Sequence, residues 1–225
     1  MKPRILLATT TLPDGSTLQL QEHDGRRYLQ THECQTAGPA TRRAEQELAR
    51  IGTSPFRSAK QPKIFIAGLG LGELLNAATL SLLQKKGTFI VGEPLTDLVE
   101  WQRKYFPESA AATDPRVRFV TDAGPAAFAG QAGEFHAILL HADICPLDAN
   151  GGFIVGNRRW LGTAYDALQD GGLLGIAAGR RIHGIERILS RAGFNVAEHA
   201  VESDPNARKP RIQPIWLARK GKPAI

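Results

Sequence analysis

The sequence predicts an α/β protein whose larger part is a mostly parallel β-sheet covered by helices. From residue 63 onward, short apolar runs alternate with segments of helical composition, which is the pattern of parallel strands joined by crossover helices. Residues 4–33 instead contain strand-like runs joined by turn sequences, which predicts a small β meander. Near the C-terminus two strand-like runs are separated only by a polar loop, so one edge strand should run antiparallel.

The first predicted unit, residues 1–52, consists of the β meander and one helix. Its strands are expected at residues 4–12, 17–22 and 26–31. The intervening PDGS and HDG sequences are typical of tight turns. After a break at TAGP, residues 41–51 have helical composition, with Thr41 as the expected N-cap. A polar, proline-containing linker at residues 54–62 leads to the second unit.

The second predicted unit, residues 62–225, alternates strands and helices. Its strands are expected at residues 64–67, 88–91, 117–120, 137–140 and 173–178, followed by two closing strands at 195–201 and 212–219. Its helices are expected at residues 73–83, 95–105, 160–168 and 183–192, the third of them ended by the sequence QDGG. Because parallel strands end at one edge of a sheet, the residues that follow the first four strands should lie near one another.

Composition argues against several classes of function. The chain has 225 residues, 42% of them apolar, but its apolar runs are too short to cross a bilayer. Cys34 and Cys145 lie in unrelated contexts without a CxxC motif or a His/Cys cluster, so we expect no metal and a cytoplasmic location. The net charge is +6, but the basic residues are scattered and no nucleic-acid-binding motif accompanies them. We therefore expect neither a nucleic-acid nor a membrane partner.

A glycine-rich turn joins the first strand of the second unit to its helix. The sequence GLGLGE places Gly68, Gly70 and Gly72 directly before Glu73, and a strand that runs through a glycine turn into a helix commonly binds a nucleotide. A dinucleotide fingerprint would have its third glycine at position 73. The carboxylate of Glu73 would repel a pyrophosphate bound at the helix N-terminus, but it is compatible with a nucleoside that lacks phosphates. The alternative is a tight turn that holds no ligand.

Acidic residues follow the next two strands. Glu93 ends the strand after the glycine turn, where an ionised carboxylate can accept both hydroxyl groups of a ribose. Asp122 and Ala123 follow the third strand. The Asp122 carboxylate can accept a hydrogen bond from an adenine amino group, and Ala123 presents its backbone amide beside it. Either acid could instead be an ordinary surface or turn residue, but the register of Glu93 with the glycine turn favours ribose binding.

The order of these motifs resembles the polyamine aminopropyltransferases, and most closely short bacterial spermidine synthase-like proteins. The matching segments are GLGLG, VGEP, the helix with Trp101 and Tyr105, DPRVRFVTDA and FHAILLHADICP. The resemblance implies a Rossmann-like core of the class I methyltransferase type, a homodimer, and decarboxylated S-adenosylmethionine or S-adenosylmethionine as donor. It also implies that the three glycines form the donor loop, that Glu93 holds the ribose, and that Asp122 with Ala123 holds the adenine.

The acceptor side departs from the family pattern. Family members have two aspartates after the fourth strand, whereas this chain has His141 in place of the first and retains Asp143. Arg158 and Arg159 lie in the segment where an acceptor lid would close, and they would repel a polyamine if they faced the site. Nearer the N-terminus, Glu45 matches an acidic family position.

These residues support two hypotheses of different classes. In the first, an aminopropyl group is transferred to a small amine acceptor, which Asp143 orients while His141 takes its proton. In the second, the chain is a catalytically altered or inactive nucleoside-binding homologue, and His141 is a strand-end histidine bonded to backbone. A small-molecule S-adenosylmethionine-dependent methyltransferase is a further alternative. The sequence DICP lacks the pattern of methyltransferases that act on nucleobases.

Overall fold

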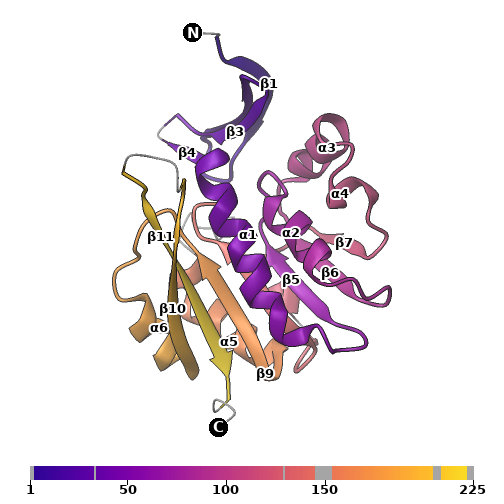
Figure 1. The fold of residues 1–225 in the computed structure, drawn as a ribbon, viewed down its shortest axis with the longest axis vertical. Helices are drawn as coiled ribbons and strands as arrows, with labels where there is room; N and C mark the ends of the chain where they lie inside the picture. The colour runs from indigo at the N-terminus through magenta and orange to yellow at the C-terminus, as the bar shows by residue number, and fades with distance from the viewer. Residues whose placement is uncertain (1–2, 33, 129, 145–153, 205–208, 222–225) are drawn as a thin grey trace.

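The computed structural model describes residues 3–32, 34–128, 130–144, 154–204 and 209–221, and it contains two β-sheets (Figure 1). A four-stranded sheet comes first in the chain and lies beyond one end of the larger sheet. A seven-stranded sheet forms the body of the molecule. Within the described ranges, none of the helices has the length and apolar character needed to span a bilayer.

The N-terminal sheet is the antiparallel meander that the sequence predicted. Its strands, in spatial order, are β1 (Ile5–Thr11), β2 (Thr17–His23), β3 (Arg26–Gln30) and β4 (Gln35–Ala37). The first three correspond to the predicted strands and are joined at the PDGS and HDG turns. The sequence did not indicate β4, because a strand of three residues next to TAGP is too short to show a period.

The large sheet has the order β10-β11-β9-β8-β5-β6-β7. The strands that pair in parallel are β5 (Lys63–Ala67), β6 (Thr88–Gly92), β7 (Val117–Val120), β8 (Phe135–His141) and β9 (Leu168–Ala177). β11 (Ile212–Lys220) runs antiparallel to both of its neighbours, β9 and β10 (Phe194–Glu202). The sheet is therefore mostly parallel with an antiparallel pairing at one edge, which confirms the predicted α/β class.

Helices cover both faces of the large sheet. Alternate residues of β8 belong to two separate core clusters, so each face has its own core: Ala137 and Leu139 lie in one, Ile138 and Leu140 in the other. The first cluster includes residues of α1 (Pro39–Thr53), α2 (Glu73–Ser81) and α3 (Thr96–Tyr105), and the second those of α5 (Arg158–Ala167) and α6 (Ile185–Arg191). The remaining elements are the short helix α4 (Ala110–Thr113) and the 3-10 turns Ser54–Phe56, Pro125–Phe128 and Ile154–Gly156.

Two boundaries differ from the sequence prediction. α1 begins at Pro39 with Gly38 as its N-cap, so Thr41 lies within the first turn and is not the cap. The Thr41 hydroxyl instead accepts a hydrogen bond from the Gly38 N–H (3.2 Å). The QDGG sequence, expected as a turn after the helix, belongs to β9, which begins at Leu168 directly after α5. Within this strand Gly171 has a φ of +75°, a left-handed conformation that favours glycine.

The register of the parallel strands brings the candidate residues to one edge. Ala67 at the end of β5 pairs with Gly92 of β6 and with Leu140 of β8. Gly92 pairs in turn with Val120, the last residue of β7. The four strands therefore end at one level, and the residues that follow them line the carboxyl edge, where open α/β sheets bind ligands.

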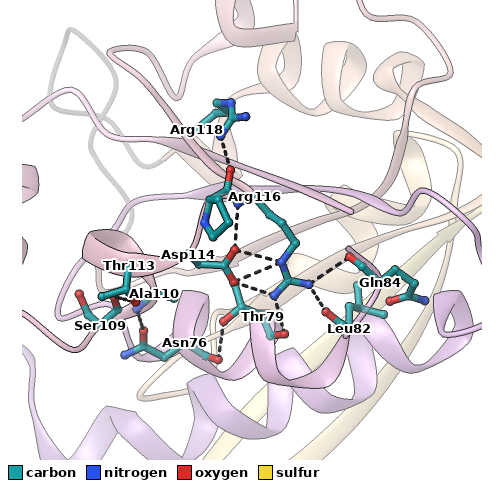
Figure 2. Close-up of polar contacts among 11 residues, drawn as sticks. Asn76, Thr79, Leu82, Gln84, Ser109, Ala110, Thr113, Asp114, Arg116 and Arg118 are labelled. Carbon is teal, nitrogen blue, oxygen red and sulfur yellow. Dashed lines mark hydrogen bonds and ion pairs between the residues drawn. The ribbon is translucent and has the colours of Figure 1, made fainter. Parts of the chain in front are cut away.

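An arginine anchors the end of α2 that lies away from this edge. Arg116 directly precedes β7, and its guanidinium contacts the Asp114 carboxylate at 2.6–3.2 Å (Figure 2). The same guanidinium donates to the carbonyls of Thr79 (3.0 Å), Leu82 and Gln84 (3.3 Å). Carbonyls at a helix C-terminus lack partners within the helix, and a cation there also complements the helix dipole. The helix that begins at the glycine turn is thus fixed to β7.

We expect Arg116→Met to lower the free energy of unfolding by about 2 kcal/mol, because it leaves Asp114 and the α2 carbonyls without their charged partner. For a chain of this size the melting temperature should fall by roughly 4–8 °C, measured by circular dichroism. Arg118→Met is the matched control, since the Arg118 guanidinium is exposed and, within the described ranges, bonds only to the carbonyls of Pro115 and Val117. An equal loss in both variants would contradict an anchoring role for Arg116.

Candidate functional site

The glycine turn leaves β5 and enters α2 in a conformation that requires glycine. Gly68, Gly70 and Gly72 have φ angles of +85°, +54° and +80°, which residues with a Cβ rarely adopt. A Cβ at Gly70 would also lie 2.5 Å from Cγ2 of Ile144, shortly after the end of β8. The Gly68 N–H donates to the Gly92 carbonyl (2.9 Å). The turn therefore lies directly between the ends of β6 and β8.

Glu93 follows β6 and binds the glycine turn. Its Oε2 accepts from the Leu69 N–H and its Oε1 from the Leu95 N–H, both at 2.9 Å. The side chain therefore joins the turn to the start of α3, and the residue is only 3% exposed. A carboxylate has about four acceptor positions, so each oxygen retains one for a ligand hydroxyl. Burial raises the pKa of Glu93 to about 7, although both amide donors favour the ionised form.

Asp122 and Ala123 follow β7 beside the end of β6. Asp122 is half-buried, and its Oδ1 accepts from the Gly124 N–H (2.5 Å). The Ala123 carbonyl accepts from Nε1–H of Trp160 in α5 (2.7 Å), which fixes this turn from the opposite face of the sheet. A Cβ at Gly92 would lie 2.7 Å from the Asp122 carbonyl oxygen. Gly92 thus lets the ends of β6 and β7 approach closely, a role for which its position in VGEP gave no signal.

His141 ends β8 with its imidazole buried. The residue is 2% exposed, and its Nδ1 accepts from the Asp143 N–H (3.3 Å). Burial lowers the pKa of His141 to about 4, against a smaller opposing effect of the Asp143 carboxylate. The ring is therefore neutral near pH 7, and because Nδ1 accepts, the ring proton is on Nε2. Among the described residues, that Nε2 has no hydrogen-bond partner. His141 thus offers a buried N–H donor.

Asp143 lies two residues after β8 and is half-buried. Its Oδ2 accepts from the N–H of Gly179, which follows β9 (2.9 Å), and a Cβ at Gly179 would collide with this oxygen. No hydrogen bond from a described residue reaches its Oδ1. The carboxylate is therefore oriented by one oxygen while the other is available.

Two further buried polar side chains surround the glycine turn. Glu45 of α1 accepts from the Leu74 N–H in the first turn of α2 (3.2 Å), and burial raises its pKa to about 8. Gln102 of α3 donates to the Gly70 carbonyl (3.4 Å). The Oε1 of each has no hydrogen-bond partner in the described part of the chain. Gln102 was not predicted from the sequence. Its position four residues after Leu98, on the apolar side of the helix, could have indicated that it is buried.

The structure does not bring Arg158 and Arg159 into this group. Both are exposed at the start of α5, and Arg158 lines a groove between α5 and α6. Cys145 and residues 146–153, which include much of the segment compared with an acceptor lid, lie outside the described residues. In the part of the chain that is described, no three His, Cys, Asp or Glu side chains are grouped so that they could hold a metal ion.

Comparison with solved structures identifies the class of fold. No protein-family model and no curated protein matches this chain. A spermidine synthase from Thermotoga maritima has a TM-score of 0.73 at 17% identity, over 96% of this chain and 73% of that one. A spermidine synthase in complex with the transition state analogue AdoDATO also has a TM-score of 0.73, at 18% identity, over 96% of this chain and 74% of that one.

The same core occurs in methyltransferases. A precorrin-6y C5,15-methyltransferase from Geobacter metallireducens GS-15 has a TM-score of 0.57 at 13% identity, over 80% of this chain and 87% of that one. The chain therefore has a spermidine synthase-like fold built on a methyltransferase-type sheet, as the sequence predicted. At these identities the likeness concerns the fold alone.

Proposed function

We propose that this protein is a transferase that binds an adenosylmethionine-type nucleoside at the carboxyl edge of the large sheet and passes an aminopropyl group to a small amine. The observation that carries this proposal is the convergence of the ends of β5, β6, β7 and β8 on the glycine turn, through the contacts of Gly70 with Ile144 and of Glu93 with Leu69. We further propose a cytoplasmic homodimer without a metal, with decarboxylated S-adenosylmethionine or S-adenosylmethionine as donor.

The residues at this edge fit such a nucleoside. A Cβ at Gly70 would collide with Ile144, so the glycine lets the turn pack directly against the segment that follows β8. Glu93 has acceptor capacity for the ribose hydroxyls, and Asp122 with Ala123 is placed for an adenine. The unpartnered Gln102 Oε1 lies beside Gly72, 3.0 Å from the position of a Cβ there, and a ligand donor would satisfy it.

The acceptor amine must be oriented and must lose a proton before it attacks. When bound, the donor supplies an electrophilic carbon next to its sulfonium, so positioning contributes much of the rate. We assign both roles, orienting the amine and taking its proton, to Asp143. Its Oδ1 is available, and a carboxylate can hold an ammonium group. We do not assign proton transfer to His141 as the sequence suggested, because the Nδ1 of His141 is occupied and its pKa is about 4. Its Nε2–H serves as a donor to the bound reactants.

Calorimetry of the purified protein with decarboxylated S-adenosylmethionine, S-adenosylmethionine and methylthioadenosine tests the proposal. We expect binding of methylthioadenosine and a preference for the decarboxylated donor. A preference for S-adenosylmethionine would favour methyl transfer, because the two donors differ only at the carboxylate. If the folded protein binds none of the three, the proposed function is wrong.

The affinity for the nucleoside should rise with pH. The pKa of Glu93 is about 7 in the free protein, and ribose hydroxyls donate better to the ionised carboxylate than to the protonated one. Below pH 7 binding must therefore displace a proton, so affinity should increase by up to about tenfold per pH unit and level off above the pKa. Calorimetry with methylthioadenosine between pH 5.5 and 8.5 measures this. A flat profile would show that the ligand does not contact Glu93.

A second candidate is a nucleoside-binding protein without transferase activity. It is favoured by one observation, the buried neutral His141 at the position where aminopropyltransferases have a carboxylate. This candidate predicts methylthioadenosine binding without turnover of putrescine or spermidine. Mass-spectrometric detection of an aminopropylated amine above the uncatalysed level would eliminate it.

A further inference from the structure

A surface groove runs between α5 and α6. It has a volume of about 460 Å³ and is lined by Arg158, Leu161, Gly162, Ile188, Arg191 and Ala192. Arg158, Leu161 and Gly162 of α5 follow an i, i+3, i+4 spacing, as do Ile188 and Arg191 of α6 with the C-cap residue Ala192. One side of α5 therefore faces one side of α6. None of the residues of the carboxyl edge lines the groove, and we treat it as independent of the proposed function.

The walls of the groove carry positive charge that the described residues do not neutralise. Arg158 and Arg191 are the charged residues that line it, one on each helix, and neither guanidinium has an ion pair or hydrogen bond within the described ranges. Arg181, by comparison, is exposed and pairs with Glu186 and Glu198 at 2.6–2.7 Å. A ligand that brings carboxylates to both walls would be favoured.

The floor of the groove is aliphatic and has space for another side chain. Leu161 is buried, and Ile188 and Ala192 are half-buried. A Cβ at Gly162 would meet no atom within 4 Å. The lining contains no aromatic ring on which a base could stack. The groove is only partly enclosed, so a free small molecule bound there would stay partly exposed to solvent.

We propose that this groove binds a partner protein through a short acidic segment. An aliphatic side chain of that segment fills the space beside Gly162, and its carboxylates pair with Arg158 and Arg191. The apolar contact supplies affinity, while the two charged walls select an acidic segment over a basic one and make the binding sensitive to salt.

Fluorescence anisotropy with a labelled peptide, in which leucines are flanked by aspartates, tests the proposal on the full chain. Gly162→Leu fills the groove and should weaken peptide binding by at least about tenfold. The fold should tolerate this variant, since leucine is a better helix former than glycine. Arg158→Ala combined with Arg191→Ala should weaken binding about tenfold at low salt, with the difference shrinking at high salt.

The matched controls are Arg159→Ala and a peptide with lysines in place of the aspartates. Arg159 is on the same helix but does not line the groove, so Arg159→Ala should bind as the unmodified protein does.

Methylthioadenosine calorimetry of Gly162→Leu separates this proposal from the proposed function, because nucleoside binding should be unchanged. Failure to bind the aspartate peptide, equal binding of the lysine peptide, or unchanged binding by Gly162→Leu would each overturn the proposal. A single-stranded oligonucleotide provides a further test. If it displaces the peptide and the same variants weaken its own binding, the groove binds nucleic acid and the proposal is wrong.

Discussion

Glu93→Gln is expected to reduce the affinity for methylthioadenosine by about tenfold to a few hundredfold. The carboxylate makes charge-assisted hydrogen bonds, each worth roughly 1.5–3 kcal/mol when its removal leaves a buried partner unpaired, and every 1.4 kcal/mol is about a factor of ten. Glutamine keeps one acceptor oxygen but turns an NH₂ group toward either Leu69 or Leu95, both of which donate N–H groups to Glu93. The turn itself is therefore disturbed, and some stability should be lost together with affinity.

Glu100→Gln is the matched control for this substitution. Glu100 is exposed on α3, one turn beyond the start of the helix, and the same change of charge there should leave affinity unaltered. Asp97 is less suitable, since its carboxylate accepts from the Thr10 hydroxyl of the N-terminal sheet. Comparing the calorimetric affinity with the melting temperature of Glu93→Gln separates the loss of a ligand contact from the loss of stability. If both variants bind the nucleoside equally well, the ligand does not lie across the end of β6.

Asp143→Asn is expected to lower the rate of group transfer by about a hundredfold to ten-thousandfold while leaving nucleoside affinity nearly unchanged. The asparagine oxygen can still accept from the Gly179 N–H, so the side chain should keep its orientation. Its NH₂ group would then replace the available oxygen, and an amide donor can neither hold an ammonium group nor take its proton. Single-turnover assays with product detection by mass spectrometry measure the rate.

His141→Gln distinguishes the two candidate catalytic residues. The glutamine amide can supply an N–H donor as the neutral imidazole does, so we expect a smaller loss of rate than in Asp143→Asn. A larger loss in His141→Gln would mean that the imidazole takes the proton, despite its depressed pKa. Unchanged turnover in Asp143→Asn would remove Asp143 from the mechanism.

The sequence revealed those parts of the fold whose signals are local. Strands buried on both faces are continuous apolar runs, which is why Phe135–His141 and Lys63–Ala67 were placed to within two residues at each end. The predicted site residues lie at or just after the ends of the parallel strands, and parallel topology brings these ends to one edge. The order of the motifs then indicated the spermidine synthase-like fold.

What the sequence could not show is which atoms face each other across the fold. The bonds of Glu93 to two backbone amides depend on the path of the glycine turn. The depressed pKa of His141 depends on how deeply the folded chain buries its imidazole. Arg158 lies in the segment that the resemblance compares with an acceptor lid, where it would repel a polyamine if it faced the site. It instead borders the groove with α6, because Trp160 and Leu161 bury the adjacent face of α5 in the core.

Helix α1 precedes the linker in the chain, yet it packs on the large sheet. A Cβ at Gly52 would lie 2.7 Å from Cδ2 of Leu139 in β8, and one at Gly175 in β9 would lie 2.7 Å from Cδ1 of Leu48. The helix also reaches β10 and β11. A truncation or domain exchange made at the linker would therefore strip one face of the large sheet of its apolar cover and expose an aggregation-prone surface. Protein engineering of this fold should treat α1 as part of the body formed by the large sheet and place any cut before Gly38.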